Sequence, residues 1–131
     1  MNNNLNYRRG DILLAELGKP TGSVQGGCRP VVIIQNDIGN KHSPTLIVAP
    51  ITSRTWKKSK QPTHYHLGKT ECLSESSMVL LEQSTTIDKS CVKKYMGKLD
   101  KAQMKKVDYC IEISLGLCEV GKVELSTGGT L

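Results

Sequence analysis

The chain lacks any long hydrophobic run. Nowhere in its 131 residues do about 18 consecutive apolar residues occur, the length that a membrane-spanning helix requires. The first nine residues, Met-Asn-Asn-Asn-Leu-Asn-Tyr-Arg-Arg, do not contain the apolar core of a signal peptide. These two absences predict a protein without membrane segments, located in the cytoplasm.

Paired cysteines and clustered metal ligands are also missing. The five cysteines are odd in number, form no Cys-x-x-Cys pair, and stand in no close grouping with histidine. We therefore expect free thiols, no structural zinc and no metal or other cofactor. Cys28 lies beside a Gly-Gly pair, where it is either an exposed reactive thiol or a small residue in a tight loop.

The three histidines give only a weak catalytic pattern. His64 and His66 are two apart on an expected strand, so they share a face and could act as an acid–base pair. The simpler interpretation, which we prefer, is that both are solvated residues of a half-exposed strand. His42 falls in an expected turn and is assigned no role.

What the chain has is a basic charge and enough length for one domain. The formal net charge is +6 and the pI is about 9.1, which favours a polyanionic partner such as nucleic acid or an acidic protein. We expect a single domain over residues 1–117 and a weakly ordered tail over residues 118–131, where Gly, Ser and Thr dominate.

Short apolar segments separated by turn residues predict mainly strands. We expect strands at 11–17, 30–35, 45–51, 63–67 and 77–87, a short segment near 92–99, and a turn at 36–40. One amphipathic helix is predicted from residue 101: Asp100 and Gln103 have the spacing of a capping box, and Gly116 is a suitable end. Its expected apolar face consists of Met104, Val107, Ile111 and Leu115. This pattern predicts a small, strongly curved β-sheet or barrel with a C-terminal helix.

The most informative stretch runs from Gly22 to Asn36. Pro30 restricts the backbone of Arg29 to extended conformations, so a cation is presented at the start of a β-branched strand. The preceding Gly26-Gly27 pair lets a ligand approach the backbone closely. Arg29 is accordingly either a phosphate-binding residue or an ordinary surface arginine of a loop.

Several segments, in this order and spacing, resemble the MazF/PemK toxins over roughly residues 8–117. The matching segments are Gly10–Ile12, Gly22–Pro30, Ile34–Asp37, Ser43–Thr45, Pro50–Ser53, Pro62–His64, Leu80–Gln83 and Thr86–Lys89. The chain departs from the family where Ser84-Thr85 replaces a common Ile-Arg, so a second cation of the site is absent, unless a neighbour such as Lys89 replaces it.

The resemblance implies an SH3-like, CcdB/PemK-like barrel that acts as a homodimer. It also implies a sequence-specific, metal-independent endoribonuclease that cuts single-stranded RNA and is held inactive by an acidic, MazE-like antitoxin. The catalytic pair of the family maps onto Arg29 and Thr52. The candidate RNA-binding residues are Gly22, Ser23, Gln25, Asn36, Ser53, Trp56, Gln83 and Thr85.

The residues suit such chemistry because RNA carries its own nucleophile, the 2′-hydroxyl. Arg29 could bind two phosphate oxygens at once, and Thr52 could donate a hydrogen bond to a third oxygen. Trp56, within a basic segment, either stacks on a base or packs on the barrel. Two other functions remain open: a non-catalytic nucleic-acid-binding barrel, and a CcdB-type gyrase inhibitor, for which the ending Gly-Gly-Thr-Leu gives little support.

Overall fold

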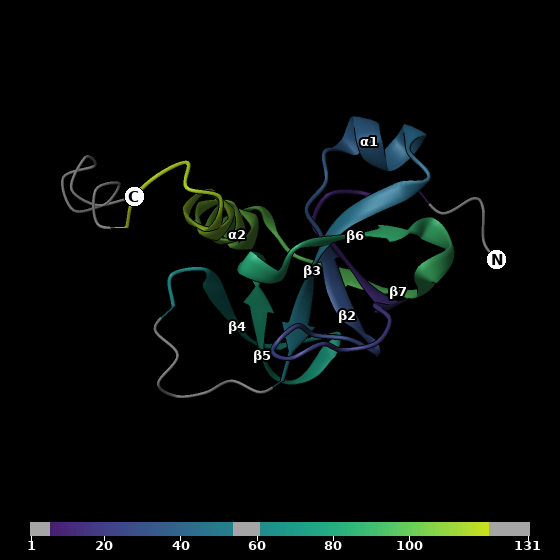
Figure 1. Cartoon of the computed structure of the whole chain (residues 1–131), viewed down its shortest axis with the longest axis horizontal. Helices are drawn as coiled ribbons and strands as arrows, with labels where there is room; N and C mark the ends of the chain where they lie inside the picture. Colours follow the sequence, from purple (N-terminus) through teal and green to yellow (C-terminus); the bar gives the residue numbers. More distant parts are fainter. Residues whose placement is uncertain (1–5, 54–60, 121–131) are drawn as a thin grey trace.

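The fold is a curved antiparallel sheet with one long helix packed outside it (Figure 1). The computed structural model describes residues 6–53 and 61–120, except for the side chain of Lys69. The elements in chain order are β1 (Asp11–Glu16), β2 (Cys28–Ile33), α1 (Asp37–His42), β3 (Thr45–Thr52), β4 (His64–Thr70), β5 (Leu73–Leu80), the 3-10 turn η1 (Leu81–Gln83), β6 (Thr85–Asp88), the 3-10 turn η2 (Lys89–Cys91), β7 (Val92–Lys98) and α2 (Lys101–Ser114). The expectation of a mainly β fold with a C-terminal helix is confirmed.

Strand β3 is the centre of the sheet. The seven strands follow the order β4-β5-β3-β2-β1-β7, and β6 pairs with β3 beside this path. Residues 45–48 of β3 pair with β6, whereas Ile51 and Thr52 pair with β5. Pro50, which has no N–H to donate, lies between these two groups, where β3 changes partner.

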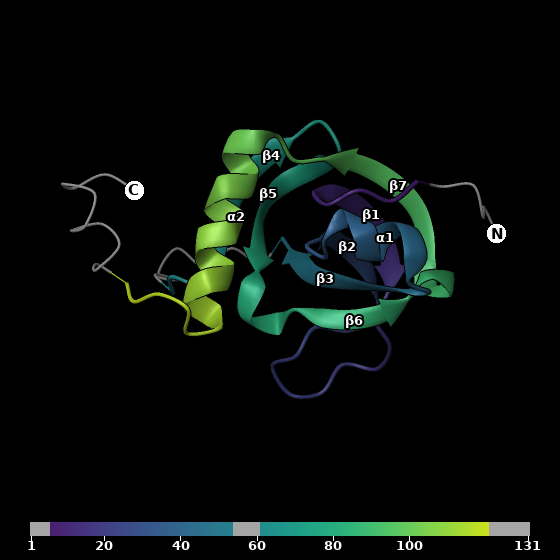
Figure 2. The same ribbon diagram turned by 90° about the horizontal axis from the view of Figure 1, so that it is seen from above.

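The sheet curves into a ring without closing. Seen from above, β5, β6 and β7 run around β1, β2 and β3, with α1 over one open end and α2 outside β4 and β5 (Figure 2). No pairing joins β4 to β7 among the strands that the structure describes. The predicted curved, barrel-like sheet is therefore confirmed in its open form.

Strand alternation divides the buried side chains between two clusters. One contains Ile12, Val32 and Ile51 together with Val107 of α2. The other contains the alternate residues of the same strands: Leu13, Ala15, Val31, Ile33, Leu46 and Val48. Because side chains alternate along a strand, Arg29 and Thr52 belong to the face of this second cluster.

The predicted strand over residues 77–87 is wrong in its continuity. Ser77–Leu80 end β5, Leu81–Gln83 form η1, and a separate strand β6 begins at Thr85. The break moves the chain from one part of β3 to another, since β5 pairs with Ile51–Thr52 and β6 with residues 45–48. A continuous apolar-to-polar run gives no local sign of such a change of partner.

The predicted turn at residues 36–40 is a capped helix. Asn36 is the N-cap of α1, and its side-chain oxygen accepts the N–H of Gly39 at 2.8 Å. Asn40 is buried and donates to the carbonyl of Gln35 at 2.9 Å. Asn and Asp favour both helix caps and turns because their side chains bond to the nearby backbone. The residues therefore indicated a change of chain direction correctly, but the prediction of a turn instead of a helix was wrong.

Helix α2 confirms the predicted capping box and differs in its buried face. Asp100 accepts the N–H of Gln103 at 2.8 Å, and Gln103 accepts the N–H of Asp100 at 2.9 Å. Val107 and Cys110 are buried, whereas Leu115 is 70% exposed, so its assignment to the apolar face is wrong. Leu115 is already the C-cap residue, beyond the last full turn of the helix.

Gly116 follows with a φ of +74°, as expected of a helix end. In the described ranges, no helix combines the length and apolarity needed to cross a bilayer. Most of the expected tail, residues 121–131, lies outside the described residues.

Candidate active site

Arg29 and Thr52 lie near the same end of the neighbouring strands β2 and β3. The β2–β3 ladder ends at the pair of Val31 with Pro50, and its register continued by two residues sets Arg29 across from Thr52. Opposite residues of an antiparallel pair have Cβ atoms about 5 Å apart. The structure therefore brings together the two residues that the resemblance paired, at the end of the sheet away from α1.

Arg29 is half-buried and held by one bond. Its Nε donates to the carbonyl of Gly26 at 2.9 Å. Its two terminal nitrogens have no acceptor among the residues that the structure describes. A guanidinium fixed at Nε, with its terminal amino groups unused, is positioned to bind an anion.

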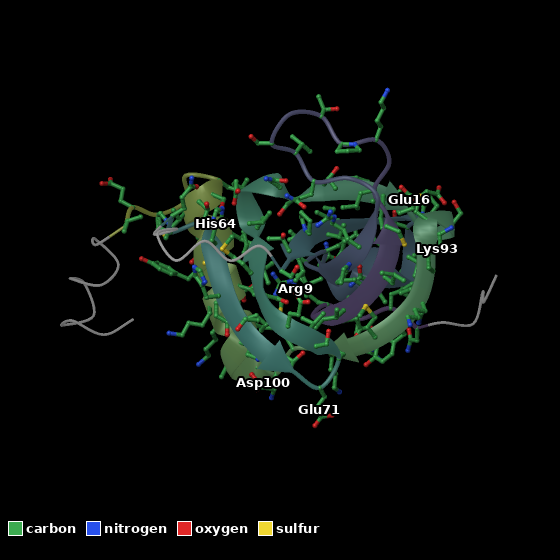
Figure 3. The ribbon with its side chains drawn as sticks, turned by 90° about the horizontal axis from the view of Figure 1, so that it is seen from below. Arg9, Glu16, His64, Glu71, Lys93 and Asp100 are labelled. Atoms are coloured by element: carbon green, nitrogen blue, oxygen red, sulfur yellow. The ribbon has the colours of Figure 1, made fainter. Side chains whose placement is uncertain are left out.

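A cavity of about 380 Å³ adjoins this arginine. It is lined by Cys28, Arg29, Pro30, Ile51, Ser53, Cys72, Leu73, Ser74, Glu75, Ser77 and Met96. Ser53 is exposed at its edge, and Thr52 behind it is only 4% exposed. Figure 3 looks at this end of the sheet, where Glu16, the partner of Cys28 in the ladder, marks the end of β1.

The loop between β1 and β2 is closed on itself beside the arginine. The N–H of Gly27 donates to the carbonyl of Gly18 at 2.6 Å, and the N–H of Leu17 donates to the carbonyl of Gly27 at 2.9 Å. Gly27 has a φ of +74°, which favours glycine. Gly26 is buried because its α-carbon packs directly against the backbone of Pro20 and Gly18.

Gln83, a predicted RNA-binding residue, is hydrogen-bonded to two other predicted residues in this loop. Its Oε1 accepts the N–H of Gln25 at 2.8 Å, and its Nε2 donates to the carbonyl of Ser23 at 3.0 Å. Gly22 is exposed in the same loop, and Thr85 is the exposed first residue of β6, two residues after Gln83. The structure thus gathers Gly22, Ser23, Gln25, Gln83 and Thr85 on one side of Arg29.

Two predicted residues are not part of this group. Asn36 caps α1 and lies beyond the other end of β2 from Arg29. Trp56 lies outside the described residues. Lys89, the suggested replacement for the missing cation, does not reach the site: its Nζ donates to the carbonyl of Asn40 at 2.6 Å and lies 5.5 Å from the ring centroid of Tyr7.

The histidines differ from each other. His64 Nε2 lies 2.8 Å from a carboxylate oxygen of Glu82, and the His64 side chain is only 7% exposed, so the expectation of a solvated residue is wrong there. His66 is exposed, as expected, and His42 is the exposed last residue of α1 rather than a turn residue. Cys110 of α2 is also buried in this region; burial, and secondarily the charge of Glu82, raise the pKa of its thiol to about 11.

Sequence reasoning missed the first half of β5 as a wall of the cavity. Ser74, Glu75 and Ser77 line it opposite Arg29. Their signal was the polar run Ser-Glu-Ser-Ser directly before the apolar residues 78–81, of which only Ser77 was assigned to the expected strand at 77–87. Cys28 is exposed and lines the same cavity with Cys72.

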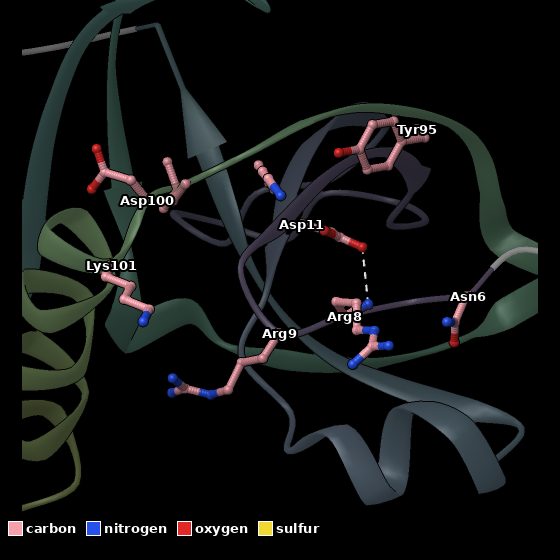
Figure 4. A pocket seen from close by; sticks show the side chains of 9 residues that line it. Asn6, Arg8, Arg9, Asp11, Tyr95, Asp100 and Lys101 are labelled. Atoms are coloured by element: carbon pink, nitrogen blue, oxygen red, sulfur yellow. Dashed lines mark hydrogen bonds between the residues drawn. The ribbon is translucent and has the colours of Figure 1, made fainter.

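A larger hollow of about 760 Å³ lies at the other end, near α1 and the start of α2 (Figure 4). Four basic residues, Arg8, Arg9, Lys98 and Lys101, line it together with the acids Asp11 and Asp100. Arg9 pairs with Asp108 at 2.7 Å, and the carboxylate of Asp11 accepts the N–H of Arg8 at 2.9 Å. Burial raises the pKa of the Asp11 carboxyl, against the lowering effects of the Arg8 N–H and of Lys98. None of the predicted catalytic or RNA-binding residues lines this hollow.

Within residues 6–53 and 61–120, no three His, Cys, Asp or Glu side chains are grouped as metal ligands. What the site near Arg29 offers is a fixed cation, the hydroxyls of Thr52 and Ser53, and a polar cavity. A phosphodiester fits this combination because its oxygens accept from a guanidinium and from hydroxyls alike.

Comparison with known proteins shows the family of this chain. Residues 8–115 match the family model described as "PemK-like, MazF-like toxin of type II toxin-antitoxin system". The chain is 53% identical to the endoribonuclease MazF of Staphylococcus saprophyticus over 111 residues, which cover 84% of this chain and 92% of that protein.

Solved structures with the same fold include MazF from Deinococcus radiodurans, with a TM-score of 0.72 and 19% identity over 86% of this chain and 99% of that one. Another is an endoribonuclease in complex with its cognate antitoxin from Mycobacterial species, with a TM-score of 0.71 and 23% identity over 86% of this chain and 98% of that one.

Proposed function

The chain belongs to the PemK-like, MazF-like toxins of type II toxin–antitoxin systems and is an endoribonuclease, and from this premise we propose that Arg29 and Thr52 carry the cleavage. The proposed reaction is metal-independent cutting of single-stranded RNA at specific sequences. One observation supports this assignment above all: the half-buried side chain of Arg29 is bonded through Nε to Gly26, its terminal nitrogens have no partner among the described residues, and the register of β2 and β3, continued by two residues, sets Arg29 across from Thr52.

The attacking group in this proposal is the 2′-oxygen of the RNA itself. It forms a bond to the adjacent phosphorus while the bond from phosphorus to the 5′-oxygen breaks. One proton leaves the 2′-oxygen and one is taken up by the departing 5′-oxygen, so the products are a 2′,3′-cyclic phosphate and a 5′-hydroxyl. No electrons are exchanged with a cofactor.

Arg29 stabilises the charge that gathers on the phosphate oxygens. A guanidinium remains protonated at neutral pH and is therefore a donor rather than a base. Its fork binds two oxygens, and the hydroxyl of Thr52 donates to a third or orients the 2′-hydroxyl. Because Thr52 is 4% exposed, the phosphate has to enter beside Arg29 for that hydroxyl to be used.

The remaining residues of the site supply contacts around the scissile phosphate. The loop residues Gly22, Ser23 and Gln25 and the neighbouring Ser53 and Thr85 are the proposed RNA contacts, and they are exposed or half-buried. Similar solved structures include an endoribonuclease in complex with its cognate antitoxin and a MazE–MazF structure from Deinococcus radiodurans. For this chain we propose a homodimer in the cytoplasm, inhibited by an acidic, MazE-like antitoxin that suits its net charge of +6.

The test is to map cleavage ends on a long RNA with the wild type and with Arg29→Ala in parallel, in the presence of a chelator. We expect discrete cuts with 5′-hydroxyl ends, and a rate for Arg29→Ala lower by roughly 10²–10³-fold, the scale for one lost aimed donor. Equal cleavage by the variant would remove Arg29 from the mechanism. Binding of RNA without any cleavage would instead indicate the non-catalytic nucleic-acid-binding barrel.

A second substrate tests the nucleophile. An oligoribonucleotide with a 2′-deoxy sugar at the cut nucleotide should bind and stay intact. Its cleavage would contradict attack by the 2′-oxygen.

A further inference from the structure

Gln83 binds the backbone of a loop that lies about 60 residues earlier in the chain. Its carbonyl oxygen accepts from Gln25 N and its amino group donates to the Ser23 carbonyl. The orientation of the amide is fixed by these partners, because a backbone N–H only donates and a backbone carbonyl only accepts. One side chain therefore ties two neighbouring points of the loop to η1.

The tied segment leads directly to the catalytic guanidinium. Gly26 follows Gln25, and its carbonyl accepts from Arg29 Nε at 2.9 Å. This is the bond that sets the direction of the guanidinium. On its far side Gly26 packs against the backbone of Pro20, so the carbonyl has little freedom while the loop keeps its shape.

We propose that Gln83 is a positioning residue for Arg29, acting through the backbone of residues 23–26 rather than by contact with RNA. The inference rests on the proposed function, since it gives Gln83 a role in the reaction that Arg29 performs. In this role the amide of Gln83 holds Gln25 and Ser23, these hold the Gly26 carbonyl, and that carbonyl aims the guanidinium at the phosphate. Gln83 keeps one free donor and one free acceptor, so direct RNA contact is the rival that the test has to separate.

The variant for the test is Gln83→Met, which keeps the length of the side chain and removes both hydrogen bonds. Thr86→Ala is the matched control, because Thr86 is an exposed residue of the adjacent strand β6 and is not among the residues that line the cavity. Single-turnover cleavage of a short RNA containing a mapped cut site gives the rate. Binding of the 2′-deoxy analogue gives the affinity separately.

If Gln83 positions Arg29, Gln83→Met lowers the cleavage rate by about 10–10²-fold, the scale for a misplaced catalytic group, and changes affinity by less than about twofold. Thr86→Ala cleaves as the wild type does. A loss confined to affinity, or a change of the preferred cut sequence at an unchanged rate, would overturn the proposal in favour of direct RNA contact.

A double-mutant cycle tests the route. If Gln83 acts only through Arg29, Arg29→Ala/Gln83→Met cleaves at the rate of Arg29→Ala alone. Multiplied losses would mean that Gln83 acts independently of Arg29 and would refute the inference. The same experiments distinguish failure of this inference from failure of the proposed function. Full activity of Arg29→Ala would refute the proposed function. An inactive Arg29→Ala together with a fully active Gln83→Met would refute only the role of Gln83.

Hydrogen exchange of the free protein supplies a readout that needs no RNA. The Gln25 amide is protected by Oε1 of Gln83, so its exchange should become at least several-fold faster in Gln83→Met while the amides of β2 stay unchanged. An unchanged Gln25 amide would show that the loop does not depend on Gln83 and would overturn the proposal, whatever the variant does to cleavage.

Discussion

Adding one methyl group at Gly26 should disable cleavage while leaving the fold intact. A Cβ at this position would meet Pro20 N at 2.4 Å, Pro20 Cα at 2.6 Å and the Gly18 carbonyl at 2.7 Å, all inside the 3.0 Å limit of real Cβ contacts. These are backbone atoms, so no side chain can rotate away to make room. The loop has to move by at least half an ångström, and the Gly26 carbonyl moves with it.

The magnitude follows from what that carbonyl holds. It accepts the only hydrogen bond that the Arg29 side chain makes among the described residues, so a shifted carbonyl releases or redirects the guanidinium. A misplacement of about 1 Å at a catalytic group costs up to about 10²-fold in rate. We therefore expect Gly26→Ala to lower the single-turnover cleavage rate by about 10–10²-fold. The clash should also lower the melting temperature, but not unfold the protein at the assay temperature, because Gly26 lies in a loop outside the two buried clusters.

Gly18→Ala is the control within the same loop. Gly18 has a φ of +87° but nothing within 4 Å of an added Cβ, so alanine there is strained without a clash. Gly18→Ala should lower the free energy of unfolding by about 1–2 kcal/mol. Its cleavage rate should fall much less than that of Gly26→Ala. Cleavage by Gly26→Ala at the wild-type rate would refute the reasoning that the loop aims Arg29. A large fall in its melting temperature would instead show that activity was lost through unfolding.

Two further predictions concern the frame of the site. Asp100→Ala removes the N-cap of α2 and should lower the free energy of unfolding by about 1 kcal/mol without changing cleavage, as measured by denaturant titration and the RNA assay; an unchanged stability would contradict the capping box. The pKa of Asp37 is lowered, chiefly by the N–H of Arg9 that its carboxylate accepts, so the unfolded chain takes up this proton first as the pH falls. Stability from Asp37 is thus present at neutral pH and lost on acidification below about pH 4, and Asp37→Asn should flatten this part of the curve of melting temperature against pH; an equally steep acid limb would contradict it.

The sequence predicted those elements that depend on local patterns. The β-branched run after Arg29 became β2, although the strand begins at Cys28, two residues earlier than expected. The capping box placed the start of α2 correctly because both of its hydrogen bonds lie within four residues. Cys110 was missed on the buried face of α2 because the apolar residues that were counted ran on to the exposed Leu115.

The features that the sequence did not predict depend on contacts between residues far apart in the chain. No local pattern shows that β3 exchanges β6 for β5 at Pro50, so residues 77–87 looked like one strand. In the same way, Gln83 and the loop at residues 23–25 were each predicted as candidate RNA-binding residues, but no periodicity reveals that they bond to each other. The resemblance predicted the members of the site, and the fold shows which of them bond to one another.

Ser84-Thr85 stands where the family commonly has Ile-Arg, so the position of Arg29 matters more in this chain. The Ser84 hydroxyl donates to the Leu81 carbonyl at 2.7 Å, and Thr85 is exposed on β6, so neither residue supplies a charge. Lys89 is committed to the far end of that strand. Among the described residues that line the cavity, Arg29 is the single cation. In the proposed mechanism, cleavage depends on how accurately this guanidinium is aimed, and therefore on the loop that aims it.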